Sequence, residues 1–204
     1  LWFRHLLRDQ EPTPSFSEAV VCLVLILVLH FAPISVYDGG NTPAMWMIRA
    51  LFITQLAVIA SPALFMGVML TTSLKKTFRL YCPSWKMLGI AALLAVALHT
   101  LSLEWMYQLA WFFPELPPEM HEPIQRLMNS KIPWWYLIGA MAVAPAICEE
   151  LAFRGFILSG VRRTGRVWLA IGLSSLAFGF MHMIPQQVFN ATILGIVLGL
   201  IAVR

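Results

Sequence analysis

Six long hydrophobic runs follow one another along the chain, separated by shorter polar segments. A helix needs about 20 apolar residues to cross the hydrocarbon core of a bilayer, and the runs are of that order. They cover residues 18–37, 44–72, 87–109, 134–161, 167–183 and 188–203. The pattern predicts an all-α fold, a polytopic membrane helix bundle with about six transmembrane helices.

Basic residues gather in alternate polar segments. The ends of the chain and two of the loops between the runs contain Arg4, Arg8, Lys75, Lys76, Arg79, Lys86, Arg162, Arg163, Arg166 and Arg204. The opposite side holds only Arg49, Arg126 and Lys131. Cytoplasmic loops are richer in Lys and Arg than outer loops. We therefore expect the N-terminus on the inside, with both ends on the same side.

Composition narrows the class of protein. Hydrophobic residues make up 59% of the chain and charged residues 12%, with a formal net charge of +4. So few charged residues do not suit the surface of a soluble domain. A disordered chain would instead have few hydrophobic residues and a high net charge. The 14 Lys and Arg residues are too few for the basic stripe of a nucleic-acid-binding protein. We expect an integral protein of a bacterial-type plasma membrane, with the lipid bilayer as a partner and no nucleic acid.

The two ends of the chain suggest a domain organisation. Residues 1–14 mix apolar and basic side chains and include Pro12 and Pro14, which predicts an interfacial helix or the end of an upstream span. Residues 15–204 are the expected membrane-embedded domain. Because the chain starts with Leu1 and stops at Arg204 directly after an apolar run, we interpret it as a fragment, truncated before its last helices. Five prolines in 114–133 predict an outer loop with one short surface helix.

Ionisable residues inside apolar runs are costly and therefore indicate function. The densest group is Glu149, Glu150 and Arg154 in the fourth run. If this helix continues to Val161, Glu149 lies 13 residues above Arg162, about 20 Å along the helix.

An imidazole is expected at a similar depth on the next helix. His182 lies 16 residues beyond Arg166, about 24 Å from the same surface. A carboxylate and an imidazole at one level of two adjacent antiparallel helices are suited to activating a water molecule.

The spacing also separates the two glutamates. Glu150 and Arg154 are four residues apart on one helix face, which favours an ion pair that we interpret as structural. Glu149 points about 100° away and remains available as a base. Phe178 is four residues before His182, so its ring is expected on the same helix face as the imidazole.

These residues resemble a known family. Glu149-Glu150-x-x-x-Arg154 followed by Phe178-x-x-x-His182 is similar to the motifs of the CAAX prenyl protease and bacteriocin-processing (CPBP, or Abi) family of intramembrane proteases. The resemblance covers about residues 134–204. It implies that Glu149 and His182 activate the hydrolytic water. It also implies a third motif, HxxxN or HxxxD, on a later helix that holds the oxyanion. No such motif follows His182 in this chain, so the fragment alone is expected to be inactive.

The expectations about a cofactor and about a preceding permease follow only from this resemblance. Both a zinc mechanism and a metal-free glutamate mechanism have been argued for the family. The chain has no HExxH, and we favour no cofactor. If zinc is used, Glu149 and His182 are the expected ligands. His30 and His99 fall at a similar depth and are interpreted as structural. A CAAX-type protease fused behind an ABC-type permease is a further arrangement that the sequence resembles.

The sequence therefore favours an intramembrane endopeptidase of the CAAX-processing type. Its expected partner is a peptide or lipidated protein substrate in the membrane, and its oligomeric state is open. The first alternative is a transport segment in which the same charged residues form a polar path. Their concentration at one level favours a site over a path. The second alternative is a non-catalytic membrane scaffold that has lost the third motif.

Overall fold

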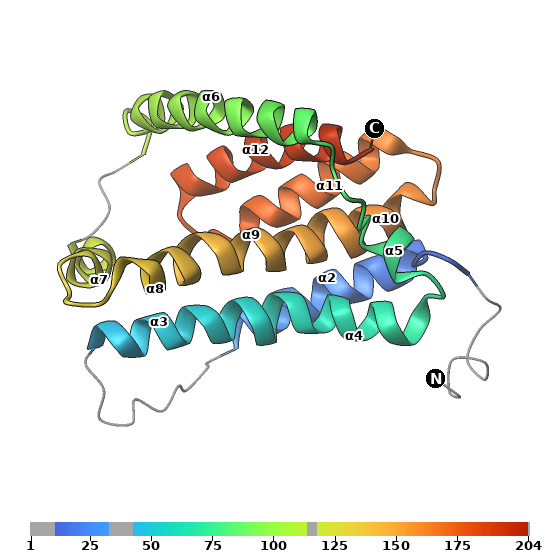
Figure 1. The fold of residues 1–204 in the computed structure, drawn as a ribbon, viewed down its shortest axis with the longest axis horizontal. Coiled ribbons are helices and arrows are strands. Elements are labelled where there is room, and N and C mark those ends of the chain that lie inside the picture. Colours follow the sequence, from blue (N-terminus) through green and yellow to red (C-terminus); the bar gives the residue numbers. More distant parts are fainter. Residues whose placement is uncertain (1–10, 33–42, 114–117, 204) are drawn as a thin grey trace.

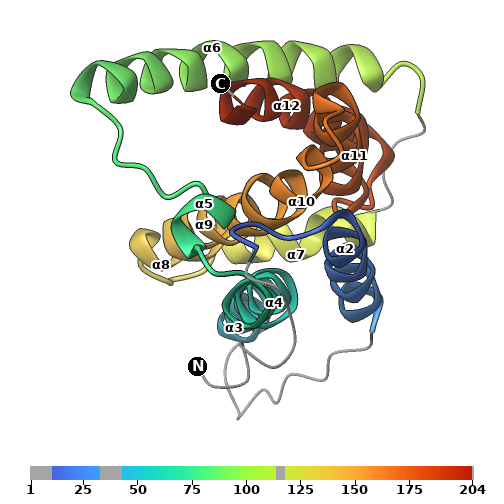
Figure 2. The same cartoon turned by 90° about the vertical axis from the view of Figure 1, so that its right-hand side faces the viewer.

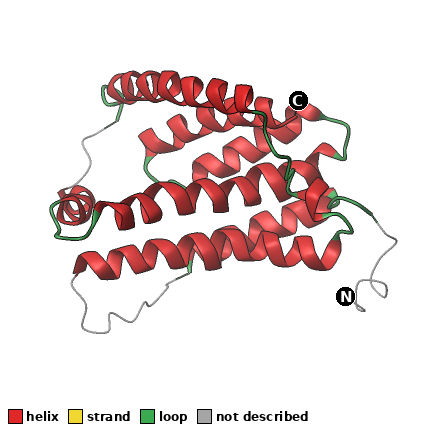
Figure 3. Ribbon diagram, viewed as in Figure 1, coloured by secondary structure: helices red, strands yellow, loops and turns green. Residues whose placement is uncertain are grey.

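All the regular structure in the described part of the chain is helical (Figure 3). The computed structural model describes residues 11–32, 43–113 and 118–203. The helices are α2 (Phe16–Phe31), α3 (Pro43–Ile53), η1 (Thr54–Ala60), α4 (Ser61–Leu70), α5 (Leu74–Thr77), α6 (Trp85–Leu109), α7 (Pro118–Met128), α8 (Trp134–Ile138), η2 (Gly139–Val143), α9 (Ala144–Glu149), η3 (Glu150–Ile157), α10 (Leu158–Arg162), α11 (Val167–Phe180) and α12 (Pro185–Val203). The all-α prediction is confirmed. Residues 1–10 of the predicted interfacial segment lie outside the described residues.

Several of these segments join end to end into longer helices. Ala44–Leu70 combines most of α3 with η1 and α4, and Trp134–Arg162 combines α8 to α10. These two, α6 and α12 are long and apolar enough to cross a membrane. α2 and α11 are apolar but have 16 and 14 residues, which is about 24 and 21 Å of helix. The chain is thus a polytopic membrane protein, although two of the six predicted spans are shorter than a bilayer core of about 30 Å.

Two helices end earlier than predicted, for different reasons. Ala32, just after α2, has extended backbone angles. The next residue is Pro33, and a proline disfavours the helical conformation of the residue before it. The rest of the predicted first run, from Pro33 to Tyr37, lies outside the described residues. α11 ends at Phe180 instead of Met183, because Met183 has a φ of 59° that turns the chain into α12.

The core lies where four of the membrane helices meet. α2, the helix Ala44–Leu70, the helix Trp134–Arg162 and α11 bury Ile26, Val58, Phe153, Phe156 and Ile171 in one cluster. α10 approaches α2 so closely at Gly160 that an added Cβ would lie 2.6 Å from Ala19 Cβ. Figure 1 shows these long helices running side by side, so that polar residues at similar depths can meet.

α6 lies on the outside of the bundle. It contacts α12, and Figure 2 shows it on the side of α12 away from α3 and α4. None of its most hydrophobic stretch is buried. An apolar helix surface of this kind suits contact with lipid, where the backbone groups are satisfied within the helix.

Polar contacts tie the chain together at the predicted inner end of the bundle. Arg163 forms an ion pair with Glu11 at 3.2 Å. Ser159 donates to the Thr77 carbonyl at 2.9 Å, across 82 residues of sequence. Thr77 itself donates to the Pro12 carbonyl at 3.2 Å. These bonds fix the loop around α5 beside the end of α10.

The opposite end contains the expected short helix. α7 is the short helix that was predicted within residues 114–133, so this part of the prediction is confirmed. The outer position of the segment stays a prediction. Its Leu127 is fully buried against Ile48 of α3 and Ala140 of η2. Arg126 and Glu122 form an exposed ion pair at 2.6 Å along the helix. The surface helix therefore packs on the ends of two membrane helices.

Candidate active site

The first motif lies where α-helical and π-helical geometry alternate. α9 follows the π-helical segment η2 and leads directly into η3. Pro145 is in the first turn of α9, where its lack of an N–H breaks the regular bonding of a continuous helix. Glu149 ends α9 and Glu150 begins η3. π-helical turns inside α-helices occur frequently at functional sites.

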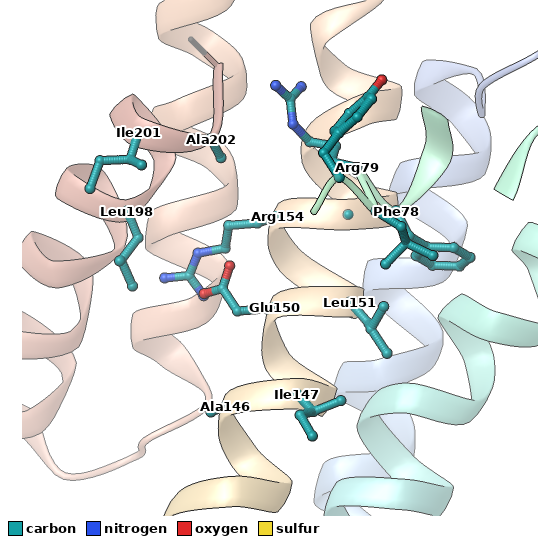
Figure 4. Close-up of a pocket in the computed structure, with 13 residues that line it drawn as sticks. Phe78, Arg79, Ala146, Ile147, Glu150, Leu151, Arg154, Leu198, Ile201 and Ala202 are labelled. Atoms are coloured by element: carbon teal, nitrogen blue, oxygen red, sulfur yellow. The ribbon is translucent and has the colours of Figure 1, made fainter. Parts of the chain in front are cut away.

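Glu150 and Arg154 form the ion pair that their spacing predicts. Arg154 Nη1 lies 3.4 Å from Glu150 Oε1, and the Arg154 side chain is 4% exposed while that of Glu150 is 47% exposed. Figure 4 shows the two groups pointing toward each other and toward Leu198 of α12. Among the described residues, Arg154 Nη1 and Nη2 have no hydrogen-bond partner.

These two residues line a cavity of about 610 Å³. Its walls come from η3, α12 and the loop after α5, and its polar lining includes Arg79 (Figure 4). Burial lowers the pKa of the Arg79 guanidinium, and the nearby charge of Arg162 lowers it further. The lining of the cavity thus includes a second cation besides Arg154.

Arg154 also links the first motif to the second. Its guanidinium carbon lies 4.0 Å from the centroid of the Phe178 ring on α11. The edge of the same ring system meets the His182 imidazole at a centroid distance of 5.0 Å. Phe153 contacts Phe178 as well, at 5.5 Å. The Phe178 ring therefore lies between the structural cation and the imidazole.

His182 lies just beyond the end of α11, in the turn before α12, rather than on the helix itself. Its Nδ1 is 3.0 Å from the Phe178 carbonyl oxygen. A carbonyl oxygen only accepts, so Nδ1 carries the proton and the neutral ring keeps its lone pair on Nε2. The backbone thereby fixes both the orientation and the tautomer of the imidazole.

Glu149 points away from Glu150 and toward the helix Ala44–Leu70. Gln55 Nε2 donates to Glu149 Oε1 at 3.1 Å. Glu149 also lies close enough to His182 and Arg154 for their charges to interact. The Glu149 carboxylate therefore faces Gln55, within range of the His182 charge, whereas Glu150 lines the neighbouring cavity.

Two further polar residues belong to this region. His30, near the end of α2, lies beside His182 and the Met181 carbonyl. Gln55 is a polar residue that the sequence reasoning missed. The available signal was an uncharged amide in the middle of an apolar run, which usually has a polar partner on a neighbouring helix. His99 lies elsewhere, in a cavity of about 700 Å³ between α6 and α12.

The His, Cys, Asp and Glu side chains of the described residues do not form a complete metal site. Within 11–32, 43–113 and 118–203, no three or more His, Cys, Asp or Glu side chains are grouped so that they could hold a metal ion. A catalytic zinc ion is usually held by three protein ligands. The described residues therefore do not fit a zinc site by themselves.

The comparisons with known proteins concern the C-terminal part of the chain. Residues 131–204 match the family model described as type II CAAX prenyl endopeptidase Rce1-like. This segment contains Glu149, Glu150, Arg154, Phe178 and His182. No curated protein and no solved structure matches the chain.

Proposed function

We propose that this protein cleaves a peptide bond within the membrane, since residues 131–204 match the family model described as type II CAAX prenyl endopeptidase Rce1-like. The observation that carries the proposal is the placement of Glu149 and His182. Glu149 comes from the helix Trp134–Arg162 and His182 from the turn after α11. Their charges lie close enough to interact, and both residues are part of the matched segment. An acid–base pair in an apolar bundle supports hydrolysis by an activated water.

Glu149 is the proposed general base. It takes a proton from a water molecule, and the hydroxide forms a bond to the carbonyl carbon of the scissile peptide. When the C–N bond breaks, Glu149 returns the proton to the leaving nitrogen, so that one water is consumed and no net proton is released. His182, with its proton on Nδ1, offers Nε2 to the same water as a hydrogen-bond acceptor. The oxyanion is expected to be held by the third motif that the family resemblance implies.

The proposed substrate is a peptide or lipidated protein that reaches the site from the bilayer. A CAAX-type cleavage site is the first candidate because the matched family is described as a prenyl endopeptidase family. The bacterial-type plasma membrane as location and a mechanism without a metal stay predictions.

The test uses the full-length protein in detergent or lipid and an S-farnesylated CAAX peptide with a fluorophore and a quencher on either side of the scissile bond. We expect Glu149→Gln to abolish cleavage, because the amide keeps the shape but cannot accept the proton. The matched control is Glu104→Gln, which changes an exposed glutamate on α6. Cleavage by Glu149→Gln at the wild-type rate would contradict the proposal.

A further inference from the structure

The hydrogen bond to Glu149 comes from a part of the chain outside the matched segment. Gln55 precedes Glu149 by 94 residues and lies on η1, against which α9 packs. The family match begins at residue 131 and therefore says nothing about Gln55. Any role of this amide must be argued from its own surroundings.

Gln55 is buried to an unusual degree for its residue type. It is 9% exposed and shares η1 with the buried residues Val58, Ile59 and Ala60. Glutamine is mostly found on protein surfaces, and burying an amide costs free energy unless its polar atoms are hydrogen-bonded. An apolar side chain would fill the same space without that cost. The position of Gln55 is therefore explained by what its amide contacts.

The hydrogen bond determines which way the amide faces. An ionised carboxylate only accepts hydrogen bonds, so the NH₂ group of Gln55 must face Glu149. The Gln55 Oε1 then points elsewhere, and among the described residues it is buried with no hydrogen-bond partner. Nearly all buried acceptors in proteins are paired with a protein group or an ordered water. Gln55 thus offers an acceptor directly beside the candidate base.

We infer that Gln55 is a positioning residue of the active site. Its NH₂ group holds the Glu149 carboxylate in one orientation, and its Oε1 accepts a hydrogen bond from an ordered water beside that carboxylate. This inference rests on the proposed function. The attacking water then donates one hydrogen to Glu149 and the other to Nε2 of His182, so the lone pair of its oxygen is left to face the peptide carbonyl.

The test is a comparison of kinetic constants for the full-length protein on the farnesylated fluorogenic peptide. Gln55→Met keeps the length and volume of the side chain and removes both polar groups. A hydrogen bond to a charged group is worth about 1.5–3 kcal/mol, so kcat should fall by about 10- to 100-fold. KM should stay within about twofold, because Gln55 contacts Glu149 and water rather than the substrate. A purely structural role would lower the melting temperature and leave the kcat of the folded fraction unchanged.

The matched control is Gln108→Met on α6. Gln108 Nε2 donates to Glu104 Oε1 at 2.7 Å on the exposed helix surface, so the same pair of groups is broken away from the site. An unchanged kcat for Gln55→Met, together with loss of cleavage by Glu149→Gln, overturns the inference and leaves the proposed function standing. Cleavage by Glu149→Gln overturns the proposed function itself.

A structure of the wild-type protein provides a test that needs no variant to fold. An electron cryo-microscopy map of the full-length protein that resolves waters should show one within hydrogen-bond distance of both Gln55 Oε1 and the Glu149 carboxylate. A protein donor bonded to Oε1, or an Oε1 without that water, overturns the water-holding role.

Discussion

The guanidinium carbon of Arg154 lies 4.0 Å from the centroid of the Phe178 ring. A cation over an aromatic face is attracted by the quadrupole of the ring, most strongly when both groups are desolvated. Arg154 is 4% exposed and reaches Phe178 from a different helix. Because Phe178 also contacts His182, this contact couples the carboxylate motif to the imidazole motif through a single ring.

We predict that Arg154 stabilises the fold mainly through this contact. Arg154→Met removes the cation from Phe178 and from Glu150, and a desolvated cation–π contact is worth about 2 kcal/mol. Arg154→Lys keeps the charge but loses the planar group that stacks on the ring, so an intermediate effect is expected. The measurement is the melting temperature and folded yield of the full-length variants in detergent.

The control for this prediction is Arg126→Met. It breaks the exposed ion pair with Glu122 at 2.6 Å, and exposed pairs contribute little to stability. An equal loss of stability in Arg126→Met and Arg154→Met would show that burial and the Phe178 ring do not matter.

Phe178 is expected to affect activity as well as stability. Phe178→Leu removes the ring that contacts both Arg154 and the imidazole, so that only the backbone bond to the residue-178 carbonyl still holds His182. We expect a lower kcat on the farnesylated peptide together with a loss of at least about 2 kcal/mol of stability, because the cation–π contact with Arg154 and two aromatic contacts are removed. Phe180→Leu is the control, because Phe180 is on the same helix and is 61% exposed. Equal activity of the two variants would argue against a role of the ring at the site.

A substitution at His182 can separate the two roles of the imidazole, which are the bond from Nδ1 to the Phe178 carbonyl and the acceptor at Nε2. In His182→Asn, the side-chain NH₂ group can take the place of Nδ1 and keep the bond to the Phe178 carbonyl, but nothing replaces Nε2. We expect the variant to fold and to lose cleavage by about 10²-fold or more, the usual contribution of a positioned acid–base group. In the double variant with Glu149→Gln the losses should not add, since both groups act on one water. Additive losses would place the two residues in separate steps.

Most helix ends were predictable from the sequence to within about three residues, because apolar runs end at charges and prolines. The end of α2 is an exception, since the helix ends at Phe31 and the predicted run continues to residue 37. α6, predicted from 87 to 109, is observed from Trp85 to Leu109. The end of α11 was predicted three residues late. Met181 and Met183 continue the apolar run, and the positive φ of Met183 leaves no trace in hydropathy.

The site was predictable only in part. Counting residues from basic loop ends predicted Glu149 and His182 at one depth, and their charges lie close enough to interact. Gln55 was missed because a single uncharged amide produces no periodic pattern. Its partner lies on another helix, 94 residues later. Contacts between helices of this kind depend on which faces meet, and one sequence does not contain that information.

We predict that alanine at two glycine positions changes stability in opposite directions. Gly160 lies at the close contact between α10 and α2, whereas Gly172 faces open space. At Gly160, a methyl group would lie 2.6 Å from Ala19 Cβ and 2.7 Å from the Ser15 carbonyl oxygen. Because the carbonyl belongs to the backbone, α2 would have to move, and we expect Gly160→Ala to lose about 1–3 kcal/mol of stability. At Gly172 on α11, an added Cβ meets nothing within 4 Å. Gly172→Ala should therefore gain up to about 1 kcal/mol from helix propensity alone.

Melting temperatures of the two full-length variants in one detergent provide the comparison. Helix propensity favours alanine at both positions, so a common shift from that source cancels when the variants are compared with each other. The difference then reports the space between α10 and α2. If Gly160→Ala were as stable as Gly172→Ala, α2 would not pack against α10 as closely as described. The segment from Glu11 to Ser15, which leads into α2, would then not be fixed beside the end of α10.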